Sequence, residues 1–351
     1  MAVLTKTEQA MDILEEAIRR GKWQAGQRLP SERALMADLG ISRTTLRHAM
    51  AALANENLIV ARPGSGTYVV EGAVPTAIGI LAVSMQLISP MGYWYHSLVE
   101  ELQKKISDNG RRAMLFVASG SSQQEVLEST GISDKSVIKN LAGVIALQDI
   151  GPFKKLLDKN RINHVTMSGI APELGPMVRQ DLASMYTMAR QIFESKGYTN
   201  YSVMIASRDD KSSAMYNYWC QLISDFVDGD SSRIISAPFT PDYRYSYDAF
   251  KEVWESGRRP RAIFFPDDAI FDVASRAIVE LGIKVPEELA IITEASTVRR
   301  FNFPIEVTRL GWDPAQMADT AWRMLFNLVS GEDKAEDYIS VPPIILEGNS
   351  I

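Results

Sequence analysis

From residue 77 onward, short continuous apolar runs alternate with longer segments in which apolar residues recur every three or four positions. Runs of the first kind are typical of buried strands, and the helical period is typical of amphipathic helices. The runs predict strands at 77–83, 112–118, 143–147, 164–169, 201–206, 262–266 and 290–293. The periodic segments predict helices at 93–110, 123–141, 185–197, 215–226, 247–256 and 271–282. Repeated strand–helix units indicate an α/β fold with parallel sheets and right-handed crossovers.

This part of the chain is long enough for two Rossmann-like lobes. We expect a first lobe of about 77–170 plus 310–330, and a second lobe of about 171–309 plus 331–351. Because ligands of such folds bind at the carboxyl ends of the strands, a ligand site is expected between the lobes. Residues 73–76 are predicted to link residues 77–351 to a separate domain formed by residues 1–72.

Residues 29–70 have a different pattern, that of two short helices and a hairpin. Ser31 can cap a helix over 32–39, and Gly40 can end it in a left-handed conformation. Ser42 can cap a second helix, which has one apolar face formed by Leu46, Met50 and Leu53. The run LIVARPGSGTYVV (58–70) then predicts two short strands around a tight turn. We interpret this stretch as a helix-turn-helix followed by a β-wing.

Polar residues gather at the start of the second helix, at Arg43, Thr44, Thr45, Arg47 and His48. In a helix-turn-helix, these positions meet base edges in the major groove. Arginine can bond guanine through two hydrogen bonds, and threonine can bond a phosphate or contact a thymine methyl group. Single arginines of this kind are usually solvated helix charges, but the ordered set favours DNA binding.

The charge distribution agrees with this interpretation. Residues 19–62 hold eight lysines and arginines against three acidic residues, whereas the whole chain has a net charge of −6. A basic region on an acidic protein is the expected electrostatic footprint of a DNA-binding domain.

Composition limits the remaining classes of function. Hydrophobic residues make up 46% of the 351 residues and charged residues 23%, which supports sizeable cores in two or three domains. The N-terminus lacks the apolar core of a signal peptide, and no run approaches the roughly 20 apolar residues that span a bilayer. We therefore expect a soluble, cytoplasmic protein with no membrane partner.

Catalysis finds little support in the sequence. The three histidines lack a metal-binding spacing, and neither a GxSxG elbow nor a P-loop is present. Cys220 is the single cysteine, and its aromatic-rich surroundings predict a buried structural thiol rather than a nucleophile. We expect neither enzymatic activity nor a cofactor.

The N-terminal motifs resemble those of the GntR family of bacterial transcription regulators. The matching words, in order, are LPSER (29–33), SRTTLR (42–47), Leu53 with Asn57-Leu58, and GSGTYV (64–69). Residues 17–30 fit that family's first helix and its short connection.

The resemblance implies which residues bind DNA. Arg33, Arg43, Thr44, Thr45 and Arg47 would contact the duplex, and the wing around Gly64 would enter the minor groove. Their neighbours complete the candidate DNA-binding set: Ser42, His48, Pro63 and Ser65. His48 stands where that family commonly has glutamate.

Residues 77–351 resemble the effector domain of the LacI/GalR family, which shares its fold with periplasmic sugar-binding proteins. The matching stretches are PDDAIFDVASRAIVELGIKVPEELAII (266–292), 181–198 and 307–331. A GntR-type head on such a body is similar to hybrid regulators of the arabinose-repressor type.

Some positions depart from the LacI/GalR pattern. The arginine usual in the sugar cleft would fall near Met215, and the usual Gly-Tyr-Asp-Asp reads Thr293-Glu294-Ala295-Ser296. Asp267 does stand where that family commonly has asparagine or aspartate. These departures argue against an ordinary hexose as the ligand.

Candidate effector-binding residues lie at predicted strand ends and crossovers. Aromatic faces can stack on the C–H surfaces of a sugar, and polar side chains can fix its hydroxyl groups. The candidates are Tyr93, Trp94, Tyr95, Asp149, Arg208, Asp267, Trp312 and Asp313. The alternative for the aromatic residues is core packing, and for the aspartates it is a helix N-cap.

The sequence therefore predicts a ligand-responsive transcription regulator, most simply a repressor of a carbohydrate utilisation operon. The two heads of a homodimer would bind the half-sites of a pseudopalindromic operator in duplex DNA, and a small sugar-like effector would release or retain them. In the alternative interpretation, the C-terminal domain is mainly a dimerisation scaffold or binds a non-sugar metabolite. The DNA-binding motifs disfavour a plain solute-binding protein. A fusion to a pyridoxal-phosphate enzyme would need about 100 further residues.

Overall fold

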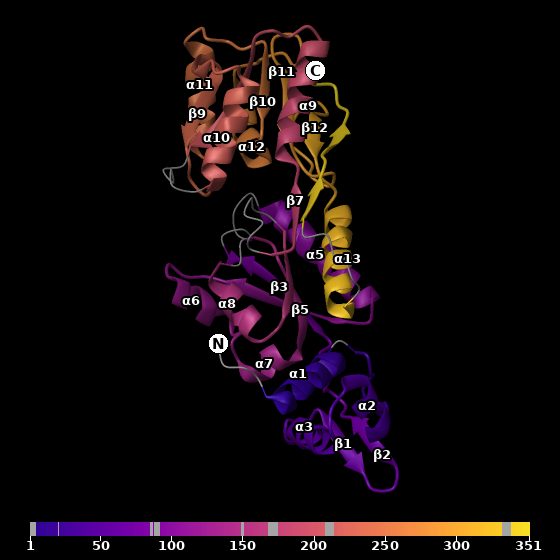
Figure 1. Cartoon of the computed structure of the whole chain (residues 1–351). Coiled ribbons are helices and arrows are strands. Elements are labelled where there is room, and N and C mark those ends of the chain that lie inside the picture. Colours follow the sequence, from indigo (N-terminus) through magenta and orange to yellow (C-terminus); the bar gives the residue numbers. More distant parts are fainter. Residues whose placement is uncertain are drawn as a thin grey trace.

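A computed structural model describes residues 5–19, 21–84, 87, 92–148, 151–167, 175–207, 214–331 and 338–351. The elements form a small N-terminal head and two larger lobes, arranged in a row (Figure 1). Among these residues, no helix combines the length and the apolar content needed to cross a bilayer.

The head has the predicted helix-turn-helix and wing. Its elements are α1 (Lys6–Arg19), α2 (Glu32–Leu39), α3 (Arg43–Asn55), β1 (Ile59–Arg62) and β2 (Gly66–Val69). The side chain of Ser31 caps α2, Gly40 ends it with a φ of 63°, and the side chain of Ser42 caps α3. β1 and β2 pair in antiparallel fashion. The head has its own apolar core, in which Leu14, Leu35, Leu46 and Leu53 are buried.

The first lobe is built on a parallel sheet with the strand order β13-β7-β6-β5-β3-β4. Its strands are β3 (Ala77–Val83), β4 (Arg112–Ala118), β5 (Leu141–Ala146), β6 (Asn163–Thr166), β7 (Met177–Gln180) and β13 (Tyr338–Val341). Its helices are α5 (Gly92–Asp108), α6 (Gln123–Thr130), α7 (Lys135–Asn140), α8 (Gly151–Lys159) and α13 (Pro314–Ser330).

The second lobe is built on a sheet with the strand order β14-β12-β11-β10-β8-β9, in which only the edge strand β14 is antiparallel to its neighbour. Its strands are β8 (Tyr201–Ser207), β9 (Ile234–Pro238), β10 (Ala262–Phe265), β11 (Ala290–Glu294), β12 (Thr308–Gly311) and β14 (Ile344–Leu346). Its helices are α9 (Leu182–Ser195), α10 (Ala214–Phe226), α11 (Tyr245–Glu255) and α12 (Asp268–Glu280), with a short 3-10 turn at Ser231–Arg233. The α/β fold with parallel sheets is thus confirmed.

The structure departs from the expected lobe boundary. Residues 177–180 and 338–341 were expected in the second lobe, but β7 and β13 pair with each other and extend the sheet of the first. Each is only four residues long and carries polar or exposed side chains such as Arg179 and Tyr338, so its apolar pattern is weak. The chain therefore crosses between the lobes after β7, β12 and β13.

Two local expectations are also corrected. The helix expected over 123–141 is divided at Gly131, which has a φ of 65°, and Asp134 caps a new helix. Cys220, expected to be a buried thiol, is exposed on α10. The buried face of that helix is formed instead by Leu222, Ile223 and Phe226.

Candidate functional site

The start of α3 presents the predicted DNA-binding side chains to solvent. The side chains of Arg43 and Arg47 are 66% and 61% exposed, and their Nε atoms lie 3.3 Å and 3.7 Å from one carboxylate oxygen of Glu32. Exposed ion pairs of this kind contribute little free energy. Both guanidinium groups are therefore available to an incoming phosphate or base.

The other predicted DNA-contacting residues lie on α2, in the case of Arg33, and at the cap and first turns of α3. Arg33, Thr44 and His48 are exposed, as is Ser42. Thr45 is half-buried, and its hydroxyl group lies 2.8 Å from the Ser42 hydroxyl in the helix cap. Thr45 thus has a structural contact that competes with the predicted contact to DNA.

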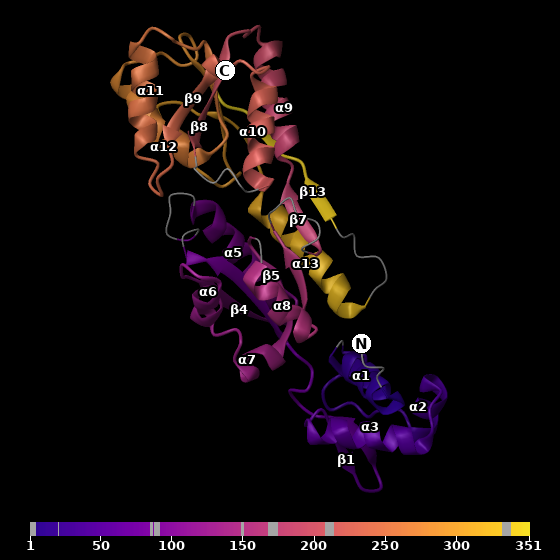
Figure 2. The ribbon, with the colours of Figure 1, turned by 60° about the vertical axis from the view of Figure 1, so that its left-hand side comes forward.

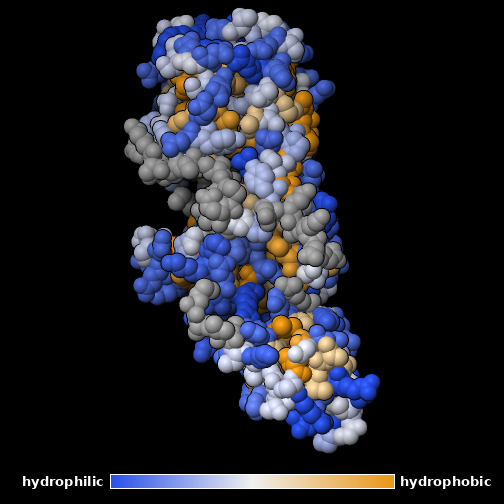
Figure 3. All heavy atoms as spheres, in the orientation of Figure 1, coloured by the Kyte–Doolittle hydropathy of each residue, from blue (hydrophilic) through white to orange (hydrophobic). Residues whose placement is uncertain are grey.

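The wing is a firmly held hairpin with Pro63, Gly64 and Ser65 exposed at its turn. Hydroxyl groups of Ser65 and Tyr68 lie 2.6 Å apart, and the guanidinium of Arg62 lies 4.5 Å from the centre of the Tyr68 ring. Hydrophilic side chains dominate this lower end of the head (Figure 3).

Two further arginines belong to this surface but were not among the predicted contacts. Arg62 lies on the wing itself, and Arg28 pairs with Tyr68 through an isolated backbone bridge. A Cβ atom on Gly66 would lie 2.6 Å from Arg28 Nε, so the glycine permits this close packing. Both arginines belong to the basic region 19–62, which indicated DNA binding in general. The sequence did not show that Arg28 lies beside the wing.

A second site lies where the strands of the second lobe end toward the first lobe. Asp267, which follows β10, accepts hydrogen bonds from the Ala269 backbone N–H at 2.9 Å and from the Tyr243 hydroxyl at 3.0 Å. The helix-cap alternative therefore applies to Asp267, and its second oxygen is held by a tyrosine.

Two aspartates contact Arg299 at this place. Arg299 Nε lies 3.0 Å from Asp268, and its Nη2 atom lies 3.4 Å from Asp272. Burial raises the pKa of Asp268 to about 7, with a further contribution from the negative charge of Asp267 that outweighs the opposing effect of Arg299. Burial also raises the pKa of Glu294 well above its ordinary value, and the charge of Asp268 adds to that shift.

Tyr93 connects this acidic site to the first lobe. Its hydroxyl donates a hydrogen bond to the Val298 carbonyl at 3.0 Å, and the guanidinium of Arg299 lies 5.3 Å from the centre of its ring. Because Tyr93 lies on α5 and the other two residues belong to the second lobe, these contacts join the two lobes.

The remaining effector candidates have mixed outcomes. Trp94 and Tyr95 are half-buried and pack against the main apolar cluster. Trp312 is only 1% exposed, and its indole N–H donates to the Val341 carbonyl at 2.8 Å. The geometry therefore favours core packing for Trp312. Asp313 caps α13. Asp149 and Arg208 lie outside the described residues.

Asp268, Glu294 and Arg299 were not predicted as site residues. Asp268 follows the predicted residue Asp267. Glu294 lies within Thr293-Glu294-Ala295-Ser296, the stretch that departs from the LacI/GalR pattern. Arg299 lies in a loop without any periodic pattern, so no signal in the sequence pointed to it. Among the described residues, no group of three or more histidine, cysteine, aspartate or glutamate side chains could hold a metal ion.

Comparison with known proteins gives separate matches for the two parts of the chain. Residues 6–69 match the gntR family of bacterial regulatory proteins, and residues 160–351 match the periplasmic binding protein-like domain. The mannosyl-D-glycerate transport/metabolism system repressor MngR of Escherichia coli is 41% identical over 66 residues, which are 19% of this chain and 28% of that protein. The chain spans less than half of the length of the curated relatives that it matches.

Solved structures share the fold over a much larger part of the chain. A complex of the transcriptional regulator CelR with cellobiose has a TM-score of 0.63 at 16% identity and covers 92% of this chain and 100% of the other. The Lac repressor dimer bound to operator and an anti-inducer has a TM-score of 0.63 at 12% identity and covers 78% of this chain and 93% of the other. The chain therefore belongs to the periplasmic binding protein-like domain family, and ahead of that domain its residues 6–69 match the gntR family of bacterial regulatory proteins.

Proposed function

We propose that this protein is a ligand-responsive transcriptional repressor of carbohydrate utilisation. As a homodimer, it would bind a pseudopalindromic operator in duplex DNA through α3 and the wing. A small sugar or sugar derivative bound between the lobes would control this binding. Because its proposed target is an operator in duplex DNA, we place its action in the cytoplasm, and the proposal includes no catalytic step.

The observation that carries this proposal is the exposure of Arg43 and Arg47 at the start of a capped recognition helix. In helix-turn-helix proteins, this part of the second helix contacts base edges. The β1–β2 hairpin, whose turn residues Pro63, Gly64 and Ser65 are exposed, lies at the end of the head away from the first lobe and supplies a second element for the duplex (Figure 1).

The arrangement of the two lobes supports the proposal that a ligand controls DNA binding. The chain crosses between the lobes at several points, and the Tyr93 contacts join them directly. A ligand that prefers one arrangement of the lobes shifts the population toward it, in proportion to its difference in affinity for the two states. The cellobiose complex of the structurally similar regulator CelR supports a sugar as the class of ligand.

The DNA-binding part of the proposal is tested with the full-length protein. Duplexes are selected from a random library, and the best one is titrated by fluorescence anisotropy at a fixed salt concentration. We expect Arg43→Ala and Arg47→Ala each to weaken binding about 10–100-fold, because a bidentate base contact contributes about 1–3 kcal/mol. Arg244→Ala is the matched control, because Arg244 is 67% exposed and paired with Asp242 in the second lobe. If no duplex is preferred over random competitor, the proposal is wrong.

The ligand is tested by thermal unfolding of the full-length protein with sugars, sugar acids, amino sugars and unrelated metabolites. A specific ligand raises the midpoint in a concentration-dependent way, because it binds the folded state. Stabilisation by sugars or their derivatives supports the proposal. Stabilisation by non-sugar metabolites alone, or by none of the compounds, contradicts the sugar effector.

A further inference from the structure

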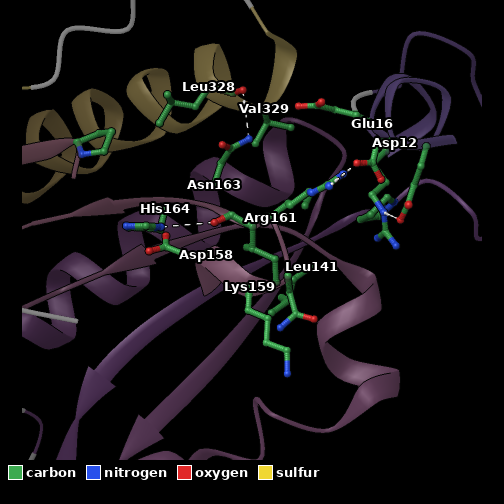
Figure 4. Close-up of a pocket in the computed structure, with 17 residues that line it drawn as sticks. Asp12, Glu16, Leu141, Asp158, Lys159, Arg161, Asn163, His164, Leu328 and Val329 are labelled. Carbon is green, nitrogen blue, oxygen red and sulfur yellow. Dashed lines mark hydrogen bonds and ion pairs between the residues drawn. The ribbon is translucent and has the colours of Figure 1, made fainter. Parts of the chain in front are cut away.

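A cavity of about 810 Å³ lies between helix α1 of the head and the first lobe (Figure 4). The wall contributed by α1 consists of the charged residues Asp12, Glu15, Glu16 and Arg19. The wall contributed by the first lobe includes Arg161, which lies between α8 and β6. The head and this lobe thus meet through charged side chains around a cavity.

Arg161 reaches across this boundary. Its Nη2 atom lies 2.8 Å from Asp12 Oδ2, and the Arg161 and Asp12 side chains are 56% and 28% exposed. The hydrogen bond to Asp12 raises the pKa of Arg161, and the charges of Asp12, Glu15 and Glu16 contribute to the same shift. Arg161 therefore lies beside three carboxylates of α1, one of which, Glu15, also pairs with Arg19 Nε at 2.7 Å.

The backbone at Arg161 is unusual for an arginine. Its φ is 53°, in the left-handed region, and its N–H bonds the Asp158 carbonyl at 3.1 Å just after α8. Helices often end with one residue in this conformation, and that residue is usually glycine or sometimes asparagine. Position 161 therefore has a backbone conformation that favours a small residue, but it is occupied by an arginine whose guanidinium contacts Asp12 of the head.

The contact leaves the DNA-reading surface free. Helix α1 packs into the head core with Leu14 and Ile18, while Asp12 and Glu16 line the cavity beside the lobe. In both ribbon views, α1 is the part of the head nearest the first lobe, and the β1–β2 hairpin lies at the far end (Figure 2). The exposed arginines of α3 therefore remain accessible while the head is docked.

We propose that Asp12, Glu15 and Glu16 of α1, together with Arg161, form an electrostatic joint that holds the head in one reading pose on the first lobe. This inference rests on the proposed function for its meaning in DNA binding, but the joint itself can be tested without DNA. A dimer whose heads are already oriented loses less conformational freedom when it binds two half-sites at once. The joint thus couples the position of the first lobe to the binding of the operator by the heads.

The first experiment measures the mobility of the head without DNA. Spin labels are attached in a Glu56→Cys/Gln123→Cys/Cys220→Ser background, which places one label on the head and one on the first lobe. We expect a narrow distance distribution by double electron–electron resonance, and a clear broadening after Arg161→Asp or Asp12→Arg. Aspartate tolerates the left-handed backbone of position 161. The double charge swap should narrow the distribution again in part, since Glu15 and Glu16 would still repel the new carboxylate.

Lys155→Asp is the matched control. It makes the same change of charge on exposed α8 surface outside the cavity wall, and it should leave the distribution unchanged. Circular dichroism and thermal unfolding establish that every variant is folded. The joint is ruled out if a folded Arg161→Asp variant keeps the narrow distribution, or if Lys155→Asp broadens it equally.

The second experiment compares a complete operator with a single half-site. We expect Arg161→Asp to weaken binding to the complete site about tenfold and to a half-site less than about twofold, because only the complete site depends on the relative pose of the heads. Equal losses on both duplexes, or tighter binding to the complete site, would overturn this role. If the wild-type protein binds no duplex specifically, the proposed function fails, while the distance measurement still decides whether the joint exists.

Discussion

At the scale of single residues, Asp268 is a carboxyl group in surroundings that differ strongly from water. It lies between Asp267, Asp272 and Arg299 and is largely removed from solvent. Burial favours the neutral carboxylic acid, and the ion pair with Arg299 favours the carboxylate. The pKa is raised on balance, so burial and the neighbouring charges outweigh the single arginine.

This balance predicts a pH dependence of stability. The pKa of Asp268 is about 7 in the folded protein and about 3.8 in the unfolded chain, so the folded state binds more protons between these values. The contribution of Asp268 to stability is therefore fully present below about pH 4 and is lost as the pH rises through 7. Asp268→Asn removes this titration and also removes the negative charge that helps to raise the pKa of Glu294. We expect the stability of the variant relative to wild type to rise by on the order of 2–4 kcal/mol from pH 4 to pH 8, measured by urea unfolding. If the free energies of unfolding of the two proteins change with pH in parallel, the prediction is wrong.

At the scale of elements, the sequence determines helix and strand positions where the local signals are strong. Ser31, Gly40 and Ser42 marked the ends of α2 and α3, and the structure uses all three as predicted. The buried central strands were visible as apolar runs, as in β10, where every residue is buried.

Other elements depend on contacts that the local sequence does not encode. β7 and β13 are separated by more than 150 residues in the chain and pair with each other, so neither gives a strong local signal. The helix expected over 123–141 is broken at Gly131, whose left-handed φ ends one helix before Asp134 begins another. The candidate site shows the same limit, because Arg299 reaches Asp268 only through the fold.

The cap of the reading helix yields a prediction at this scale. The Ser42 hydroxyl accepts a hydrogen bond from the Thr45 N–H at 3.1 Å and lies 2.8 Å from the Thr45 hydroxyl. We expect Ser42→Ala to lower the free energy of unfolding of the head by about 1 kcal/mol and to weaken DNA binding, because the first turn of α3 frays. Calorimetry and anisotropy measure the two effects.

Ser31→Ala provides the comparison for that variant. The Ser31 hydroxyl accepts from the Ala34 N–H at 3.3 Å and caps α2, which precedes the reading helix. A similar loss of stability is expected, with a smaller loss of DNA affinity. If both variants weaken DNA binding equally, the effect reflects head stability and not the first turn of α3.

At the scale of the whole molecule, the arrangement of the parts links the proposed ligand site between the lobes to the head. The head rests on the first lobe through α1, and the first lobe meets the second through the strand crossovers and through Tyr93. One apolar cluster also continues between the lobes and includes Leu102 of α5 and Phe264 of β10. A change in the relative orientation of the two lobes therefore acts on the first lobe, which carries the head.

The Tyr93 hydroxyl offers a direct test of this linkage. Tyr93→Phe removes the hydrogen bond to the Val298 carbonyl and keeps the ring beside Arg299. Since one hydrogen bond contributes about 1 kcal/mol, the equilibrium between joined and separated lobes should shift about fivefold toward separation. Distance measurements between labels on the two lobes report this shift, and a ligand that favours the joined state should bind up to about fivefold more weakly. Tyr245→Phe, at a tyrosine that is 43% exposed on α11, should change neither quantity. An unchanged distance distribution in Tyr93→Phe would mean that the strand crossovers and the shared apolar cluster alone set the relation of the lobes.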